Sequence, residues 1–277
     1  MTLDARHQAF FDLHQSGCFV IPNPWDIGSA RMMAAAGARA LATTSAGYAF
    51  TLGRPDMGRV TRDEMLAHAQ AIVGATALPV SGDLENGFDD DPDGVAETIR
   101  LAAEAGLSGC SIEDTRMVEG HPAYDFELAV ERIRAAASAA RALGRPFVLC
   151  ARADGVMNGA YDLGEALRRI RAFEAAGADL LYVPVPPGVD ELRQVVAAVR
   201  TPVNALAAGP LRDIRVADFA ALGVRRISLG STLARAAQTV IRDRMAEILG
   251  EGDFSGLKSA APGGEIDAML AKGADKA

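Results

Sequence analysis

Short apolar runs alternate with longer amphipathic stretches along the chain of 277 residues. The short runs predict strands at Cys18–Ile21, Ala38–Thr43, Leu78–Gly82, Gly109–Ile112, Phe147–Ala151, Leu180–Val183, Val203–Leu206 and Arg226–Leu229. The intervening stretches repeat with a period of about 3.6 residues. They predict helices at Gly28–Ala36, Arg62–Ala75, Gly94–Ala105, Phe126–Leu143, Leu163–Ala176, Val189–Val199 and Leu211–Leu222. Strands that are each followed by a helix predict an α/β fold of the (β/α)8 TIM barrel type.

An open, doubly wound sheet is the alternative, but the first strand-to-helix turn, IPNPWDIGSA, lacks the G-x-G-x-x-G pattern common in that fold. Further helices are predicted at Leu3–His14, Ser231–Leu249 and Ile266–Lys272. The Gly-rich segment GEGDFSGLKSAAPGG indicates a linker before the last helix, which could therefore pack on a neighbouring subunit. We expect one barrel domain over residues 1–277, with a C-terminal helical extension from about residue 231.

Composition narrows the class of function. The net charge is −8 and basic residues do not cluster, which argues against nucleic acid as a partner. No apolar run approaches the length of a membrane span, and the N-terminal residues lack the order of a secretory signal. We therefore expect a cytoplasmic protein that binds no membrane. Cys18, Cys110 and Cys150 lie in apolar runs without a C-x-x-C pair, which predicts buried thiols.

The lysines lie in one part of the chain. Lys258, Lys272 and Lys276 are the only three, and the other 25 of the 28 basic residues are arginines. A Schiff-base mechanism requires a lysine amine in a desolvated pocket. No predicted strand carries one, so the sequence argues against a lysine-dependent aldolase.

The stretch GDLENGFDDDP places Asp83 and Glu85 directly after an apolar strand. Alternate residues of a strand face the same side, so both carboxylates are expected to point the same way, with Glu113 beside them on the next strand. Three converging carboxylates repel one another, and a hard cation such as Mg²⁺ or Mn²⁺ relieves that repulsion. The alternative is that these carboxylates are helix caps and loop charges, as Asp91 and Asp93 are expected to be.

Other polar or small residues follow the remaining predicted strands, at the end where barrels of this type carry their chemistry. They are Trp25, Asp26, Ser45, Ala46, Gly47, Asp114, Arg152, Asp154 and Asn204. A guanidinium and nearby backbone N–H groups suit the carboxylate of a small oxo- or hydroxy-acid. Arg152 could instead serve only as the ion-pair partner of Asp154 or Glu113. Asn204 is expected to contribute to substrate binding.

Five motifs together resemble the phosphoenolpyruvate mutase / isocitrate lyase superfamily over about residues 23–235. They are NPWDIGSARMMAAAGARALATTSAG, GRPDMG, GDLENGFDDDP, CSIEDT and LCARADG. The resemblance implies a barrel whose eighth helix is exchanged with a partner, usually within a dimer of dimers, so we expect a homodimer or homotetramer. It also implies Mg²⁺ (or Mn²⁺) and a pyruvate-like enolate intermediate.

The resemblance further implies a role for each matching residue. Asp83 would bind the metal directly, and Asp56, Glu85 and Glu113 would hold its waters. The substrate carboxylate would be bound by Ser45, Gly47 and Arg152, in a pocket that Trp25 and Asp26 help to line. Arg152 and Glu113 are also the residues expected to take part in catalysis.

The loop after the fourth predicted strand departs from the superfamily. Lyase members carry Lys-x-Cys-Gly there, with the cysteine as acid, and mutase members carry lysine and asparagine, whereas this chain reads TRMVEGHPAYDF. His121 is the one residue of this loop that titrates near neutral pH and is the candidate acid, although a surface position is the alternative. Pro184 stands where lyase members have a glutamate.

Three functions remain open. We favour cleavage of a C–C bond in a small 2-oxo- or 2-hydroxy-acid whose leaving group needs no loop acid. P–C chemistry on phosphonopyruvate and a non-catalytic binder of dicarboxylates are the alternatives.

Overall fold

Short parallel strands form the centre of the computed structural model, which describes residues 2–274. They are β1 (Phe19–Ile21), β2 (Leu41–Ala42), β3 (Val80–Asp83), β4 (Gly109–Glu113), β5 (Val148–Arg152), β6 (Leu180–Tyr182), β7 (Val203–Leu206) and β8 (Arg226–Ser228). Their order in the sheet is β1-β8-β7-β6-β5-β4-β3-β2. The Ala42 N–H donates to the Pro22 carbonyl oxygen at 3.1 Å and brings the two ends of the sheet together. The predicted TIM barrel is confirmed.

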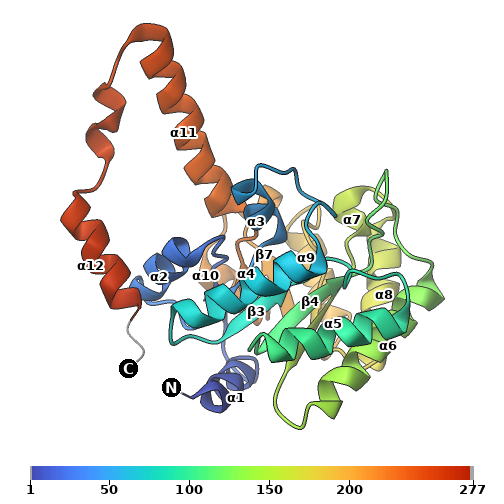
Figure 1. Ribbon diagram of the computed structural model, residues 1–277. Coiled ribbons are helices and arrows are strands. Elements are labelled where there is room, and N and C mark those ends of the chain that lie inside the picture. Colours follow the sequence, from blue (N-terminus) through green and yellow to red (C-terminus); the bar gives the residue numbers. More distant parts are fainter. Residues whose placement is uncertain (1, 275–277) are drawn as a thin grey trace.

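Helices surround the strands (Figure 1). They are α1 (Leu3–Leu13), α2 (Ile27–Ala35), α3 (Ser45–Thr51), α4 (Arg62–Ala75), α5 (Pro92–Glu104), α6 (Phe126–Ala142), α7 (Gly155–Asn158), α8 (Leu163–Ala175), α9 (Val189–Ala197), α10 (Val216–Ala221), α11 (Thr232–Glu251) and α12 (Gly263–Gly273), with 3₁₀ turns η1 (Gly209–Leu211) and η2 (Ser255–Ser259). Side-chain caps start several of them, such as the reciprocal pair Thr61 and Glu64 at α4. Within residues 2–274, none of the helices combines the length and apolar character that crossing a lipid bilayer demands.

The predicted elements differ from the observed ones at three places. The short helices α3 and α7 follow β2 and β5 and were not predicted, because four to seven residues are too few to show a helical period. The predicted helix Leu211–Leu222 is divided into η1 and α10, since a new capping interaction between Arg215 and Asp218 starts α10.

Helix α1 closes the barrel at the amino ends of the strands. Its Phe10 and Leu13 belong to the same buried cluster as Phe19 and Val148, the first residues of β1 and β5. A Cβ atom on Gly109 would lie 2.4 Å from the Val148 carbonyl oxygen and 3.0 Å from the Phe10 ring, so this approach requires glycine. The barrel is therefore open only toward the carboxyl ends of its strands.

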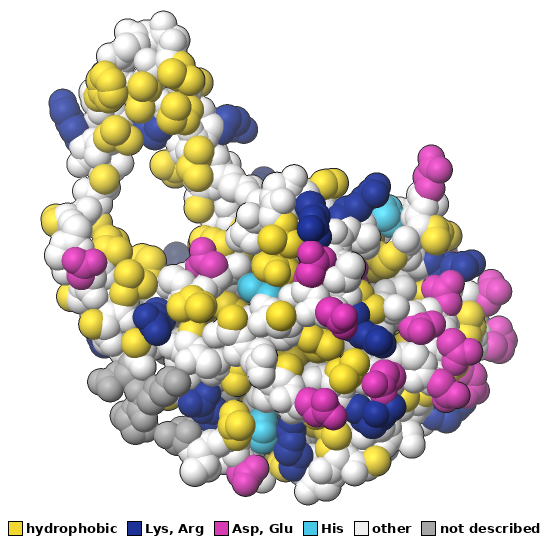
Figure 2. Space-filling model, in the orientation of Figure 1, with side chains coloured by type: hydrophobic (Ala, Val, Ile, Leu, Met, Phe, Trp, Pro, Cys, Tyr) yellow, Lys and Arg dark blue, Asp and Glu magenta, His cyan; other side chains and the backbone are white. Residues whose placement is uncertain are grey.

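Helices α11 and α12 form an arch that leaves the barrel and returns to it (Figures 1 and 2). At the return, α12 packs along α2 of the same chain, and the Lys272 ammonium donates to the Ala35 carbonyl oxygen at 2.9 Å. The segment expected to be a linker contains η2. The exchange of a C-terminal helix between two chains stays a prediction.

Candidate active site

A cavity of ≈150 Å³ opens at the carboxyl ends of the strands. Its lining includes six residues that the sequence predicted for the site: Ser45, Ala46, Asp56, Asp83, Glu113 and Arg152. Met157 and Pro184 also line it. The remaining lining comes largely from residues on the strands or just after them that carry hydroxyl, amide or guanidinium groups, among them Asn23, Thr43, Ser81, Ser111, Tyr182, Arg226 and Ser228. The volume is below the roughly 300–1,000 Å³ of pockets for drug-sized ligands, which favours a small ligand.

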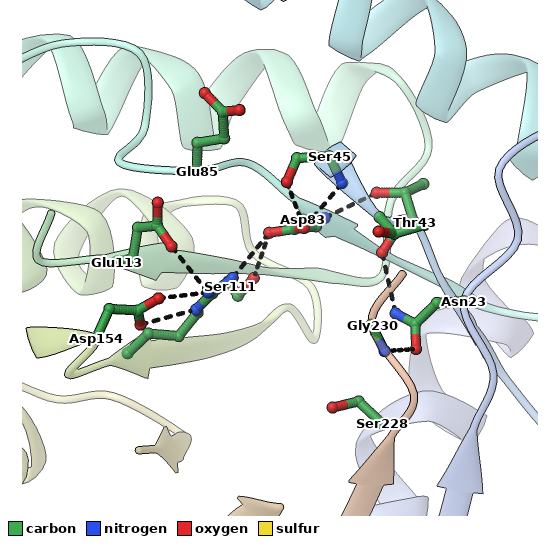
Figure 3. A network of polar contacts seen from close by, with 12 residues as sticks. Asn23, Thr43, Ser45, Asp83, Glu85, Ser111, Glu113, Asp154, Ser228 and Gly230 are labelled. Atoms are coloured by element: carbon green, nitrogen blue, oxygen red, sulfur yellow. Dashed lines mark hydrogen bonds and ion pairs between the residues drawn. The ribbon is translucent and has the colours of Figure 1, made fainter. Parts of the chain in front are cut away.

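Asp83, the last residue of β3, is held at the centre of this cavity (Figure 3). Both the backbone N–H and the hydroxyl of Ser45 donate to its Oδ2 at 2.9 Å. Arg152 Nη1 donates to its Oδ1 at 3.0 Å, and the Ser111 hydroxyl lies 3.4 Å from the same atom. Charge-assisted hydrogen bonds of this kind fix the direction of a carboxylate.

Arg152, the last residue of β5, contacts three acids at once. Beside its contact with Asp83, its Nη2 lies 2.8 Å from Glu113 Oε2 and 2.5 Å from Asp154 Oδ2. Burial alone would lower the pKa of Arg152, but Asp154, Glu113 and Asp83 together raise it well above its usual value. In this structure Arg152 therefore pairs with Asp154 and Glu113, as the alternative from the sequence expected. Its guanidinium is shared among protein carboxylates.

Glu113 and Asp114, neighbours at the end of β4, have different surroundings. Glu113 faces the cavity, and burial raises its pKa well above the usual value, against the opposing effect of Arg152. Asp114 lies outside the cavity lining, where it accepts hydrogen bonds from Tyr161, from Arg169 and from the backbone N–H of Asp154. Asp114 thus supports the position of Asp154, and Glu113 is the acid available to a ligand.

Glu85 does not join the other carboxylates. The prediction that it projects from the same strand as Asp83 is wrong, because β3 ends at Asp83 and Glu85 adopts a left-handed turn conformation with φ 46°. Figure 3 shows it apart from the Asp83 network. Its Oε1 accepts the Gly58 N–H at 3.2 Å, while its buried Oε2 has no hydrogen-bond partner. Burial raises the pKa of Glu85 to about 7.

The predicted metal site needs a corresponding correction. Across residues 2–274, no three His, Cys, Asp or Glu side chains are placed together as metal ligands. Asp83 and Glu113 are drawn to Arg152, and Glu85 lies in the turn after β3. The donors nevertheless fit a cation held mainly through water, because Mg²⁺ usually keeps several waters and takes only one or two carboxylates. The unpartnered Oε2 of Glu85 is an acceptor of the kind that such a water would satisfy.

The small residues after β2 begin helix α3 instead of forming a separate anion nest. The Gly47 N–H donates to the Thr44 hydroxyl at 3.2 Å as part of the helix cap, and Ala46 lines the cavity. A Cβ on Gly47 would lie 3.1 Å from the Trp25 Cβ, so this glycine allows Trp25 to pack closely. Gly47 and Trp25 therefore lie behind the cavity wall.

Trp25 and Asp26 do not line the cavity, contrary to the prediction. Asp26 caps α2 by accepting the Ser29 N–H at 2.6 Å, and its residue is exposed. The Trp25 carbonyl oxygen lies 3.0 Å from His68 Nε2. Both residues lie at the start of α2. Their position after β1 suggested that they line the pocket, but in the structure they stabilise the beginning of this helix.

The loop after β4 lies over the loop after β3. It contributes no acidic side chain to the cavity lining. Its Tyr124 hydroxyl donates to Asp90 Oδ1 at 2.5 Å, and Arg116 pairs with Asp90 at 2.9 Å. His121 is half-buried and is absent from the lining. His121 lies close enough to Asp56 to lower the pKa of that carboxyl. The larger effect on Asp56 is loss of water around the carboxyl, which raises its pKa although the residue as a whole is exposed. His121 is thus a neighbour of the cavity mouth.

The comparison with known families follows this geometry. Residues 10–249 match the family model described as phosphoenolpyruvate phosphomutase. The chain belongs to this family. The resemblance inferred from the five motifs is confirmed.

Three similar proteins place the chain more closely. A solved structure from Burkholderia cenocepacia J2315, described as a candidate lyase/mutase, shares 47% identity, with a TM-score of 0.92, over 97% of this chain and 96% of that one. The 2,3-dimethylmalate lyase of Eubacterium barkeri is 30% identical over 74% of this chain and 72% of its own. A solved 2,3-dimethylmalate lyase, described as a member of the PEP mutase/isocitrate lyase superfamily, has a TM-score of 0.83 at 26% identity, covering 97% of this chain and 95% of that one.

Asn204 lies outside the cavity lining, contrary to the prediction that it contributes to substrate binding, whereas its neighbour Arg226 lines the cavity. Asn204, predicted to bind substrate, is fully buried, donates to the Ser228 hydroxyl at 3.0 Å and accepts from Arg226 Nε at 2.7 Å. Sequence reasoning did not select Arg226, Ser228 or Tyr182, although all line the cavity. The available signal was an arginine inside a short predicted strand, where a charged residue is unusual.

Proposed function

We propose that the protein is a divalent-metal-dependent lyase that cleaves a C–C bond of a small 2-oxo- or 2-hydroxy-acid through a pyruvate-like enolate. The observation that carries this proposal is Asp83, fixed by Ser45 and Arg152 at the centre of a small cavity. Asp56, Asp83 and Glu113 line that cavity together with two arginines. Around Arg152, the carboxyl groups of Asp83, Glu113 and Asp154 outnumber the single guanidinium, and a bound Mg²⁺ or Mn²⁺ would add positive charge there.

Asp83 would hold the cation directly, and Asp56, Glu85 and Glu113 would hold it through water. When bound, the cation supplies Lewis-acid stabilisation of negative charge on the substrate oxygen. The assignment relies on the family resemblance and on the donor chemistry of these four residues.

The chain's own residues prepare the site. Ser45 donates twice to Asp83 and, together with Arg152, sets the direction of its carboxylate. Glu113 is the candidate proton carrier, because burial favours its protonated form. Its Oε2 contacts Arg152, so Oε1 is the atom that bears the proton in that form. The ring of Tyr182, 5.3 Å from the Arg152 guanidinium, supports the arginine from below.

The size and the lining of the cavity favour a small substrate. Pro184 lines it where lyase relatives carry a glutamate, and His121 lies outside the lining. A positioned acid typically contributes about 10²–10⁴-fold to catalysis, which a bulky tricarboxylate substrate would lose here. We therefore propose a reaction such as decarboxylation, retro-Claisen or retro-aldol cleavage of a small acid.

Two alternatives have weaker support. P–C chemistry on phosphonopyruvate would suit the family, but the cavity offers no cluster of free cations for a phosphonate dianion among the described residues. A non-catalytic dicarboxylate binder would keep the same cavity without turnover.

The decisive test is a screen of 2-oxo- and 2-hydroxy-acids with Mg²⁺ for release of pyruvate or another 2-oxo product. We expect turnover of a small acid, loss of turnover with EDTA, and negligible cleavage of methylisocitrate. Cleavage of methylisocitrate at an ordinary enzyme rate, roughly 1–10³ per second, would refute the argument from the missing loop acid. Tight binding of every acid without any product would favour the binder.

We also propose a homodimer or homotetramer assembled through α11. Of this helix only Ala234 is buried, whereas Val240, Ile241 and Leu249 are 59%, 63% and 78% exposed. Light scattering after gel filtration should give at least twice the chain mass, and Ile241→Glu should shift it toward the monomer. Exposed Arg242→Glu is the matched control. The expected cytoplasmic location stays a prediction.

A further inference from the structure

Arg132, on α6, is a buried cation outside the cavity lining. The residue is 1% exposed. Its Nη2 donates to the carbonyl oxygens of Asn86 and Asp89, the latter at 2.8 Å. Its Nη1 lies 3.5 Å from the Glu113 carbonyl oxygen. Its hydrogen-bond partners among residues 2–274 are therefore backbone oxygens, and the guanidinium joins separate segments of the chain instead of neutralising a carboxylate.

The segments that Arg132 joins carry two of the acids proposed to act on the cation. Asn86 and Asp89 belong to the turn after β3, which also contains Glu85, and Glu113 is the last residue of β4. The Glu113 N–H donates to the Glu85 carbonyl oxygen at 2.9 Å, which joins the two segments a second time. A movement of the turn relative to β4 would therefore change the distance between the two acids.

The turn after β3 has a backbone conformation that needs support. Glu85 and Phe88 have φ values of 46° and 61°, in the left-handed region that residues other than glycine rarely adopt. Such conformations are strained and persist only where surrounding contacts fix them. The two carbonyl groups bound by Arg132 Nη2 belong to Asn86 and Asp89, each directly after one of these left-handed residues.

Tyr124 fixes the orientation of the guanidinium. The Arg132 Cζ lies 3.8 Å from the centre of the Tyr124 ring, an arrangement that favours stacking of a planar cation. The Tyr124 hydroxyl accepts from Asn86 Nδ2 at 2.8 Å and donates to Asp90 Oδ1 at 2.5 Å, so the ring is held by the same turn. The stacked, planar fork can reach carbonyl groups of both segments, whereas a lysine ammonium has no such plane.

We propose that Arg132 is a positioning residue of the metal-assisted site: by holding the turn after β3 against the end of β4, it sets the places of Glu85 and Glu113. The inference rests on the proposed function, in which these two acids hold waters of the cation, and it adds the residue that places them. Arg132 is absent from the cavity lining, so it acts through the backbone of its neighbours.

The first test is isothermal titration of Mg²⁺ into Arg132→Met and into the wild type, with oxalate at one fixed concentration. Loss of a residue that orients metal-binding groups typically lowers metal affinity by about 10-fold to 100-fold, and we expect a loss in that range. Arg145→Met is the matched control. Arg145 also donates to backbone carbonyl oxygens, those of Ala103, Leu107 and Pro146, but at the amino ends of the strands, so this variant should keep the wild-type affinity.

A double-mutant cycle distinguishes positioning from a general loss of structure. In a Glu85→Gln background, Arg132→Met should lower Mg²⁺ affinity by a smaller factor than in the wild type, because the acid that it places is already gone. In a Ser45→Ala background the two losses should multiply, because Ser45 contacts Asp83 and not the turn. A merely structural role would give the same factor in both backgrounds, which would overturn the proposal.

Hydrogen exchange in EDTA gives a readout without the cation. The N–H groups of Gly87 and Glu113 bind carbonyl oxygens within the joined segments, at 2.8 and 2.9 Å. We expect both to exchange faster in Arg132→Met, whereas the Leu181 N–H, in β6, should exchange as in the wild type. If Arg132→Met fails to fold, Arg132→Lys takes its place, since it keeps the charge and loses the planar fork.

These results remain separate from those that test the proposed function. Wild-type Mg²⁺ affinity in the folded Arg132 variant, or an equal loss in Arg145→Met, would overturn the role of Arg132 and leave the lyase standing. Absence of Mg²⁺ binding in the wild type would refute the metal site, and exchange at Gly87 and Glu113 would then decide whether Arg132 holds the turn. Unchanged exchange at both N–H groups would overturn that role as well.

Discussion

Two arginines in one cavity, Arg152 largely buried and Arg226 fully so, have opposite surroundings. Arg152, at the end of β5, contacts Asp83, Glu113 and Asp154, and these acids raise its pKa well above the usual value although burial opposes them. Arg226, at the start of β8, has an amide as its hydrogen-bond partner and no ion pair among residues 2–274, and burial lowers its pKa. The first belongs to a charged network built by the protein itself. The second leaves a charge to be balanced by something else.

This difference indicates that the two levels of the cavity have different roles. The upper level is fixed before any ligand arrives, since Ser45 and Arg152 already orient Asp83. Preorganised charges of this type stabilise charge that develops during a reaction. Removing each arginine should therefore have opposite effects on stability.

The largest effect is expected for Arg152→Met. The variant leaves Asp83, Glu113 and Asp154 buried without a cation, and breaking such a buried network typically destabilises a protein by about 3–5 kcal/mol. Urea unfolding measures this change. Arg168→Met is the matched control, because its ion pair with Glu165 is on the surface and typically contributes only about 0–1 kcal/mol. If Arg152→Met lowers the free energy of unfolding by less than Arg168→Met does, the contrast drawn between Arg152 and Arg226 is wrong.

The next effect concerns Glu85 and pH. Burial raises the pKa of Glu85 from 4.5 to about 7, so at low pH the carboxyl is protonated in both the folded and the unfolded protein and has no net effect. As pH rises from about 4.5 to about 7, the unfolded state loses this proton first, and the folded state becomes less stable relative to it. The full difference is about 3 kcal/mol.

Glu85→Gln removes this dependence. We expect the variant to gain stability relative to the wild type over that pH range in EDTA, as measured by urea unfolding at several pH values. The difference between the two proteins isolates Glu85, because all other titratable groups are common to both. A constant difference across the range would show that the pKa of Glu85 is the same in the folded and the unfolded protein.

The smallest effect is expected for His121→Ala. Its ring lies outside the cavity lining, so kcat on the identified substrate should change less than tenfold. A loss of about 10²-fold or more, with a shifted pH profile, would identify His121 as the general acid and would mean that the loop moves over the cavity during turnover.

The sequence predicted the barrel because eight βα units repeat one strong pattern, and it predicted Asp83, Glu113 and Arg152 as cavity residues because strand ends converge in this fold. It failed at Glu85 because a left-handed turn right after β3 breaks the alternation on which the argument relied. Trp25 and Asp26 failed for a related reason, since the chain turns into α2 before it reaches the cavity. The ion pairs of Arg152 with Asp154 and Glu113 were foreseen only as an alternative to substrate binding. The surroundings of Arg226 depend on neighbours from several strands, which a single sequence does not reveal.

The central claim is that Asp83 and its neighbours form a metal-assisted site for a small acid. Isothermal titration of oxalate into the protein, with Mg²⁺ and with EDTA, tests it most directly, and Asp83→Asn provides the comparison. We predict binding only with Mg²⁺ and none in Asp83→Asn, whose fold should remain intact. Equal binding in EDTA, or wild-type Mg²⁺-dependent binding in Asp83→Asn, would contradict the account.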